Sequence, residues 1–245
     1  MKIIIGIDDT DNRYSRGTGH RARELGRLLS QQGLVEISNI TRHQLLVDKR
    51  IPFTSHNSAA SLVGDMISDL ESVILFCSRY LKKKSAFFSD AGLCISDYSE
   101  TGEEIMNWGA RAKKEILTKE EAHRLADQHH IFLTGLTGKK IGLIGALAAV
   151  GLRKAGNDGR LLWMKNLRVI SGIFTVNELY NLLEIDKIAD LNGVAIEPLA
   201  KVFVSDWCRP VHKNYEITLF VEEEKNNEQY EWRIASKEFI KSISE

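Results

Sequence analysis

Lys2-Ile-Ile-Ile-Gly-Ile-Asp8-Asp9-Thr10-Asp11 is the stretch around which the rest of the sequence is organised. Ile3–Ile7 is a short β-branched apolar run, which is typical of a fully buried strand. Three carboxylates follow it at once, and in open α/β sheets ligands gather outside the carboxyl ends of the strands. Because clustered oxygen ligands suit Mg²⁺ bound together with substrate phosphates, we predict a metal and phosphate site at Asp8, Asp9 and Asp11.

The same acids also fit a structural turn, since Asp side chains hydrogen-bond their own backbone and favour loops. Three carboxylates this close repel one another unless a cation, donors or water intervene, which favours the site. The sequence leaves both interpretations open.

Composition excludes several classes of protein. The 245 residues suffice for one large domain or two modest ones. With 33 basic and 33 acidic residues, no global field draws the chain to nucleic acid or an anionic membrane. No apolar run is long enough for a membrane span, and Asp8 interrupts the N-terminal run before a signal peptide can form, so we expect a cytoplasmic protein. The scattered Cys77, Cys94 and Cys208 predict reduced thiols and no zinc site.

The segment after the acids predicts a loop that enters a helix. Residues 12–19 are rich in Gly, Ser and Arg, and apolar residues then recur at helical spacing through residue 29. Such a helix start presents unpaired N–H groups to an anion, and it is lined by Arg13, Arg16, Thr18, His20 and Arg21. These bases either bind a metal–triphosphate or simply neutralise the neighbouring acids.

Two further loop-to-helix segments are candidate anion sites. We predict a strand at 44–47, preceded by Arg42 and His43, and then a helix at 59–70 with Asn57 and Ser58 as N-cap residues. The second segment, 135–151, is rich in glycine and small apolar residues, as in a helix packed deep in a core. Lys139 and Lys140 in its loop would face phosphate, or else they are solvated and the glycines only permit close packing.

Other segments complete a mixed pattern. We predict helices at 73–81, 105–117, 120–129 and 177–183, and strands at 92–95, 161–164, 200–204 and 215–221.

Four motifs carry a resemblance to a known family. They are Gly6-Ile-Asp-Asp-Thr-Asp11, the stretch 42–62 with Ile51-Pro52 and Asn57-Ser-Ala-Ala-Ser-Leu62, Ser89-Asp-Ala-Gly-Leu93, and the glycine-rich run 141–151. In this order they resemble the archaeal tRNA-Ile agmatinylcytidine synthetases, over residues 1–170. The resemblance implies an enzyme that uses ATP to phosphorylate a wobble cytidine of a tRNA, after which agmatine displaces the phosphate. It also implies that Asp8, Asp9 and Asp11 handle metal and phosphate in a kinase-like domain, beside a ferredoxin-like domain.

The sequence departs from that family at functional positions. Where the family has Cys-Thr-Thr, with a threonine that takes part in phosphoryl transfer, this chain has Arg16-Gly17-Thr18-Gly19-His20-Arg21, so Thr18 and His20 are the candidate replacements. Thr54-Ser-His56 stands where the family has Lys-Thr-Arg-Gly, so two cationic phosphate binders are missing. The chain ends at Glu245 without the family's OB-fold and zinc ribbon, and we therefore expect no tRNA binding without a partner.

These observations predict an α/β (α+β) chain in which a kinase-like subdomain packs with a ferredoxin-like subdomain. Residues 1–170 would form the synthetase-like region and residues 171–245 an unassigned α+β segment. The oligomeric state is left open, a homodimer included. The predicted site residues are Asp8, Asp9, Asp11, Thr18 and His20 for catalysis, and Arg16, Gly17, Arg21, Arg42, Asn57, Lys139 and Lys140 for binding the nucleotide.

The predicted function is an ATP- and Mg²⁺-dependent phosphotransferase or ligase that acts on a nucleotide or small-molecule acceptor. One alternative is a binding module that keeps the nucleotide or anion pocket without catalysis. Another is a phosphatase with a nucleophilic Asp, because a buried strand that runs into Asp-x-Thr is similar to the haloacid dehalogenase start. No downstream lysine and acidic loop complete that last set.

Overall fold

The computed structural model describes residues 1–51 and 56–245. The motif residues Pro52 and Thr54 lie outside the described residues. The chain divides into two compact units, Met1–Ala155 (unit 1) and Gly156–Glu245 (unit 2). The predicted boundary at residue 170 falls inside unit 2, and the assignment of residues 1–170 to one synthetase-like region stays a prediction.

Unit 1 alternates strands and helices. Its elements are β1 (Lys2–Asp8), α1 (Thr18–Gln31), β2 (Val35–Gln44), β3 (Ser58–Met66), α2 (Leu70–Lys84), β4 (Gly92–Asp97), α3 (Glu103–Ala112), α4 (Lys119–Gln128), β5 (Phe132–Gly135) and α5 (Leu143–Ala155). The strands lie in the order β5-β4-β1-β3-β2, and each pair of neighbours is antiparallel. The βαββαβ connectivity of β1 to β4 is that of a split βαβ motif. The prediction of an α/β chain is therefore confirmed.

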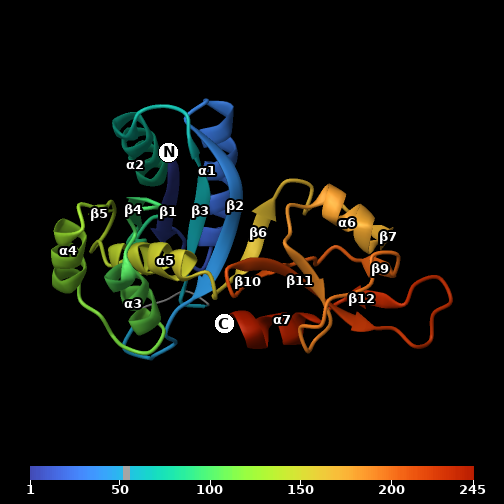
Figure 1. Cartoon of the computed structure of the whole chain (residues 1–245). Helices are drawn as coiled ribbons and strands as arrows, with labels where there is room; N and C mark the ends of the chain where they lie inside the picture. The colour runs from blue at the N-terminus through green and yellow to red at the C-terminus, as the bar shows by residue number, and fades with distance from the viewer. Residues whose placement is uncertain (52–55) are drawn as a thin grey trace. The chain divides into compact units, whose positions relative to one another are not determined.

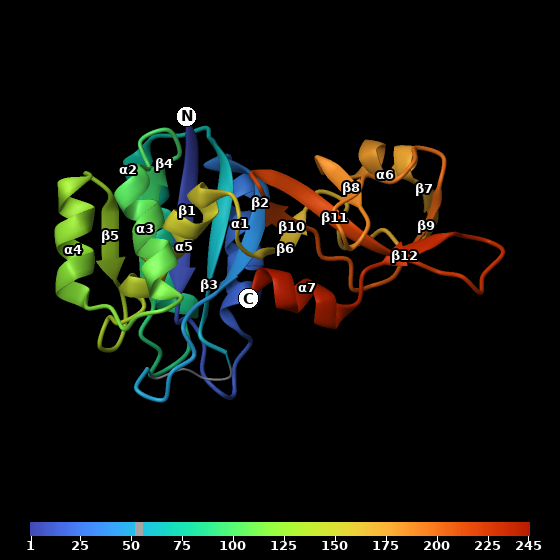
Figure 2. The same cartoon turned by 60° about the horizontal axis from the view of Figure 1, so that its bottom comes forward.

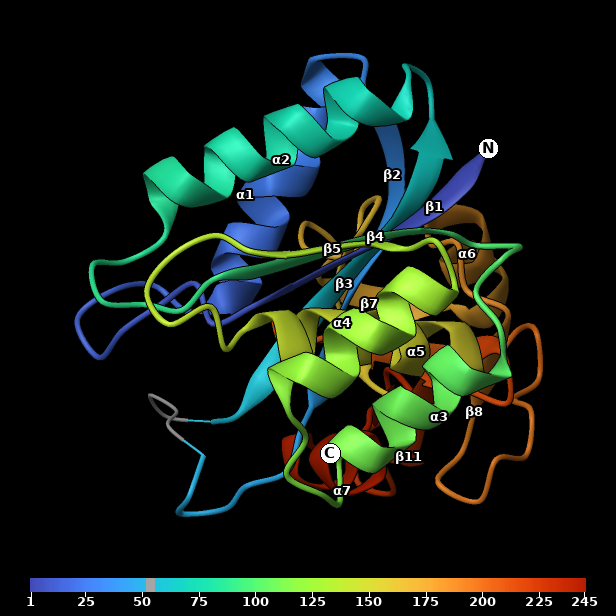
Figure 3. The same ribbon diagram turned by 90° about the vertical axis from the view of Figure 1, so that its left-hand side faces the viewer.

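Helices cover both faces of this sheet. Figure 3 shows α1 and α2 on one face and α3, α4 and α5 on the other. Helix α5 is apolar and buried along most of its length, as its small-residue sequence predicts, and it packs against β1 and β4. Its backbone passes so close to β1 that a Cβ on Gly6 would overlap the carbonyl of Ala146. The apolar run of β1 is buried because the strand has a neighbour on each side and helices on each face.

The structure contradicts two of the predicted elements. Residues 59–70 were expected to form a helix, but β3 occupies most of this stretch. Ala59–Val63 is buried throughout, so it lacks the polar face that marks a helix at the surface, and pairing with β1 and β2 overrides the helix propensity of alanine. The predicted strand 44–47 is wrong in extent, because β2 ends at Gln44 and contains Arg42 and His43. Helices α2, α3, α4 and α5 overlap their predicted ranges.

Unit 2 contains strands and hydrophobic cores of its own. Its elements are β6 (Arg160–Met164), β7 (Gly172–Thr175), α6 (Val176–Leu182), β8 (Lys187–Ala189), β9 (Lys201–Val204), β10 (Val211–Lys213), β11 (Glu216–Glu223), β12 (Trp232–Ile234) and α7 (Lys237–Ser244). The strands follow the order β6-β10-β11-β12-β9-β7, and β8 pairs with β11. Leu219 and Val221 pack into the core that contains α6, whereas Phe220 between them packs into the core that contains α7. The two helices therefore cover opposite faces of β11 (Figures 1 and 2).

The expectations for the cysteines and for membrane spans concern residues that the structure describes. Cys77, Cys94 and Cys208 are free and buried. Among the helices formed by the described residues, none has the length and apolar character to cross a lipid bilayer.

Candidate functional site

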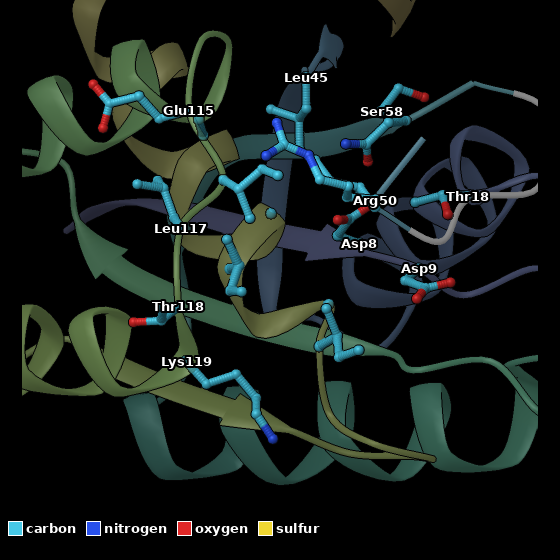
Figure 4. Close-up of a pocket in the computed structure, with 18 of the residues that line it drawn as sticks. Asp8, Asp9, Thr18, Leu45, Arg50, Ser58, Glu115, Leu117, Thr118 and Lys119 are labelled. Carbon is cyan, nitrogen blue, oxygen red and sulfur yellow. The ribbon is translucent and has the colours of Figure 1, made fainter. Parts of the chain in front are cut away.

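A cavity of about 330 Å³ lies in unit 1 where β1 and β2 end and β3 begins. It is lined by Asp8, Asp9, Asp11, Thr18, Leu45, Arg50, Ile51, His56, Asn57, Ser58, Ala112, Glu115, Ile116, Leu117, Thr118, Lys119, Glu120, Ile141, Gly142, Ile144 and Gly145. Figure 4 shows Asp8, Asp9 and Thr18 on one side of the cavity, and Leu117, Thr118 and Lys119 on the other. The cavity thus joins an acidic end to a largely apolar wall, which is the usual composition of a small-molecule site.

Hydrogen bonds hold the acidic loop against the start of α1. The carboxylate of Asp11 accepts from the backbone N–H of Thr18 at 3.1 Å and from its hydroxyl at 2.7 Å. The Thr18 hydroxyl oxygen also accepts from the backbone N–H and the hydroxyl of Thr10, at 3.3 and 3.1 Å. Because the N-cap residue Gly17 has no side chain to offer, Asp11 takes the capping role from within the loop. Thr18 is therefore a fixed residue of the site.

Charge and burial raise the pKa values of the two carboxyls nearest the strand. Burial, with the charge of Asp9 as the next cause, holds the pKa of Asp8 well above its usual range. Burial and the charges of Asp90 and Asp11 raise the pKa of Asp9 to about 6. Asp9 also adopts a left-handed backbone with φ of 50°, which costs energy in most non-glycine residues. Such a cluster of carboxyls in a partly buried place would be stabilised by a cation.

The first turn of α5 closes the acidic end of the cavity. A Cβ on Gly145 would overlap the carboxylate of Asp8, and a Cβ on Gly142 would press on the backbone of Asp90. Close helix packing through Gly142, Gly145 and Gly151 is therefore what the structure shows, since Gly151 also meets the backbone of Ile105. The same packing brings Gly142 and Gly145 into the cavity wall.

The fold brings together some of the predicted site residues. Asp8, Asp9, Asp11, Thr18 and Asn57 all line the cavity. Asn57 was expected to start a helix, but its side-chain amide donates to the carbonyl of Leu46 at 2.8 Å and ties the ends of β2 and β3 together. The predicted loop-to-helix anion site at Asn57 is wrong, because a strand follows this residue.

The remaining predicted residues do not line this cavity. They are Arg16, Gly17, His20, Arg21, Arg42, Lys139 and Lys140. Arg21 forms an ion pair with Glu24 at 3.0 Å, and Glu24 also accepts from the hydroxyl of Tyr80 at 2.7 Å. Nη1 of Arg16 lies 3.5 Å from Nε2 of His20, and partial burial with this and nearby arginines lowers the pKa of His20. Arg42 donates to the side chain of Gln44 at 2.8 Å.

Asp90 fixes the loop that carries the two lysines. Its carboxylate accepts from the backbone N–H of Lys139, and its carbonyl accepts from the N–H of Gly142 at 2.9 Å. Lys140 has a left-handed backbone with φ of 63°, and its Cβ lies where a side chain on Gly135 would be. Gly142 and Gly145 lie against Asp90 and Asp8 at the acidic end of the cavity, whereas the two lysines lie outside its wall.

Several lining residues escaped the sequence analysis. Residues Glu115 to Glu120 run from the link after α3 into the first turn of α4 and carry no pattern that points to a ligand, and neither do Leu45 and Arg50 after β2. Thr118 and Glu121 form a capping box at the start of α4, a signal that the sequence does contain. That signal marks a helix start and not a binding site, so only the fold shows that this turn faces the carboxylates.

The described residues contain no group of three or more His, Cys, Asp or Glu side chains arranged to hold a metal ion by themselves. Asp11, one of the three predicted ligands, is bonded to Thr18. A site for Mg²⁺ does not require three protein carboxylates, because this ion keeps several waters and binds through one or two carboxylates plus substrate phosphates. Burial and neighbouring carboxylates raise the pKa of both Asp8 and Asp9, so these two residues fit a cation of this kind.

The fold is that of a mixed α/β protein, and solved structures of tRNA agmatidine synthetases share it. The crystal structure of apo TiaS, a tRNA agmatidine synthetase, aligns with 62% of this chain and 35% of its own at a TM-score of 0.54 and 23% identity. The complex of TiaS with its tRNA and ATP aligns with 62% of this chain and 36% of its own, at a TM-score of 0.54 and 24% identity. The complex of TiaS with its tRNA, AMPCPP and agmatine aligns with 99% of this chain and 55% of its own, at a TM-score of 0.55 and 19% identity. The chain therefore has a TiaS-like fold.

The sequence comparisons add a relative and no family model. The uncharacterised protein MJ0921 of Methanocaldococcus jannaschii is 30% identical over 154 residues, which are 62% of this chain and 50% of that protein. No family model matches the chain. The chain spans about half the length of this curated relative and 35% to 55% of the TiaS structures described above.

Proposed function

We propose that this chain is an ATP- and Mg²⁺-dependent phosphotransferase or ligase that acts on a nucleotide or small-molecule acceptor. The observation that carries the proposal is the cavity of unit 1, in which Asp8 and Asp9 at the end of β1 face an apolar wall in a volume of about 330 Å³. Supporting it, the chain has the fold of TiaS, which has been solved with ATP and with AMPCPP.

Each part of the cavity has a role in this proposal. Asp8 and Asp9 would hold the metal ion, and a bound Mg²⁺ supplies charge neutralisation and orientation of the phosphates. The hydroxyl of Thr18, which donates to Asp11 and accepts from Thr10, would hold the acidic loop in place beside the bound ligand. The apolar wall around Leu117 and Ile144 excludes water from the bound ligand and would receive its base.

A second candidate function is a nucleotide- or anion-binding module without catalysis. The observation that favours it is the position of the predicted catalytic and phosphate-binding bases. His20 and Arg16 contact each other outside the cavity wall, and Arg21 is paired with Glu24. In that case the acidic end would bind a metal–nucleotide complex and no group would pass to an acceptor.

Calorimetry with Mg²⁺–ATP and Mg²⁺–AMPCPP tests the binding that both functions require. We expect the Asp9→Asn variant to bind at least about tenfold more weakly than the parent, because it removes one charged ligand of the ion. Asp127→Asn, an exposed acid at the end of α4, is the matched control for loss of a charge. If Asp9→Asn binds like the parent, the acids form only a turn and the proposal fails.

Product analysis separates the two functions. Release of ADP or AMP from ATP that depends on an added acceptor identifies the enzyme, whereas tight binding with unchanged ATP identifies the binding module. Because TiaS has been solved with tRNA, tRNA belongs among the acceptors, tested by filter binding at two salt concentrations. We expect weak binding from a chain with zero net charge, and a sub-micromolar salt-sensitive complex would identify RNA as the acceptor instead.

A further inference from the structure

Among the described residues, the cavity wall carries five acidic and three basic side chains. Its wall carries the carboxylates of Asp8, Asp9 and Asp11, that of Glu115 between α3 and α4, and that of Glu120 in the first turn of α4. The basic side chains in the same wall are His56, Arg50 and Lys119. A triphosphate that enters through its metal ion still needs cationic contacts for the oxygens that the ion does not reach. These cationic contacts must come from the basic side chains of the wall.

Arg50 already forms an ion pair with a carboxylate. Its guanidinium donates to both oxygens of Asp48, at 2.9 Å from Nε and 2.7 Å from Nη2. This bidentate contact raises the pKa of Arg50 and lowers that of Asp48, and the Arg50 side chain is 74% exposed. A phosphate would have to displace Asp48 to gain the full strength of this arginine.

Lys119 is the contrasting case. Its ammonium donates to the carbonyl of Lys139 at 3.1 Å, and it makes no ion pair with any residue in the described ranges. An ammonium has three donors, so two remain for a ligand. Lys119 lies across the cavity from Asp8 and Asp9 (Figure 4).

The contact with Lys139 also connects Lys119 to the acidic loop. The backbone N–H of Lys139 donates to Asp90, and the charge of Asp90 is one cause of the raised pKa of Asp9. Both contacts are made by the Lys139 backbone, whose N–H donates to the carboxylate of Asp90 and whose carbonyl accepts from the Lys119 ammonium. A ligand between the acids and Lys119 would contact both Asp9 and Lys119, the two residues that this series of interactions connects.

We propose that Lys119 is the phosphate-binding cation of this cavity, which supplies a positive charge that the sequence 54–56 does not provide. The proposal rests on the proposed function and assigns the contact to a single residue at the start of α4. Lys119 binds the terminal phosphates of a nucleoside triphosphate whose metal ion is held by the acidic end. Lys139 and Lys140, which follow a glycine-rich loop in sequence, have no such position because their side chains lie outside the cavity wall.

The test measures phosphate affinity with and without the charge. Lys119→Gln keeps a donor for the Lys139 carbonyl and removes the positive charge, whereas Lys119→Arg keeps the charge. Calorimetry with Mg²⁺–ATP and Mg²⁺–tripolyphosphate should show affinity about ten- to a hundredfold lower for Lys119→Gln and partly restored for Lys119→Arg. Lys114→Gln, an exposed lysine between α3 and α4 that does not line the cavity, is the matched control and should bind like the parent. A circular-dichroism melt checks that every variant is folded.

The outcomes distinguish the role of Lys119 from the proposed binding of a nucleotide. Equal affinity of Lys119→Gln and the parent overturns the role of Lys119, while nucleotide binding itself stands. A loss confined to Lys139→Gln or Lys140→Gln overturns it as well and assigns the contact to the glycine-rich loop. If the parent binds neither Mg²⁺–ATP nor Mg²⁺–tripolyphosphate, the proposed function fails and the role of Lys119 fails with it.

Discussion

Replacement of Asp9 by asparagine should stabilise the metal-free protein at neutral pH, although it removes a charged group of the candidate site. Burial and the charges of Asp90 and Asp11 raise the pKa of Asp9 from its ordinary value of 3.8 to about 6. This difference corresponds to about 3 kcal/mol between the two protonation states, and because Asp9 is partly exposed, solvent screening reduces the effect to about 1–3 kcal/mol. Asparagine also tolerates the left-handed backbone at this position.

The sign of the pH dependence follows from the direction of the shift. The folded protein holds the Asp9 proton more tightly than the unfolded chain, so its free energy of unfolding falls as pH rises from about 4 to above 6. The penalty is absent below the unfolded value of 3.8 and complete above about 6. Asp9→Asn should therefore be more stable than the parent at pH 8 by about 1–3 kcal/mol and nearly equal to it at pH 4.

Urea unfolding between pH 4 and pH 8 in the presence of a chelator measures this difference. Addition of Mg²⁺ at pH 8 should then stabilise the parent more than Asp9→Asn, because a ligand of the folded state shifts the equilibrium by mass action. Asp127→Asn serves as the control with no expected pH-dependent gain. A variant that is less stable than the parent at pH 8, or a difference that is the same at every pH, would refute the electrostatic account of this loop.

Two further predictions concern the framework that holds the loop. Gly145→Ala should lower the free energy of unfolding by about 1–3 kcal/mol in a thermal or urea melt, because the added Cβ meets the carboxylate of Asp8 and overpacks the contact between α5 and β1; unchanged stability would mean that α5 can move away from the strand. Tyr80→Phe should cost about 1–2 kcal/mol in urea unfolding, since it removes the 2.7 Å hydrogen bond to Glu24 between α2 and α1, and a neutral effect would show that Glu24 is satisfied by other partners.

The strand and the helix on either side of the acidic loop could be predicted because their sequence signals are local. Ile3–Ile7 is β-branched and is followed at once by polar residues, and the helix after it repeats apolar residues at the right spacing. The stretch 59–70 gave no such signal. A short apolar run buried on both faces looks the same to periodicity whether it is a central strand or a buried helix, and only pairing with its neighbours decides.

The candidate site was predictable only on its acidic side. Asp8, Asp9 and Asp11 are adjacent in sequence, so their chemistry can be recognised without a fold. The opposite wall comes from the turn before α4, more than a hundred residues further along the chain, and Lys119 has no neighbour that marks it. Lys139 and Lys140 followed a glycine-rich loop, a pattern that favours phosphate binding, but the bond from the Lys139 backbone to Asp90 and the left-handed conformation of Lys140 fix the loop with both side chains outside the wall. The antiparallel sheet and the packing of its helices place the start of α4 opposite the end of β1, and this brings Lys119 to face the cluster of acids. Local sequence patterns do not contain this placement, so the cation could not be predicted from them.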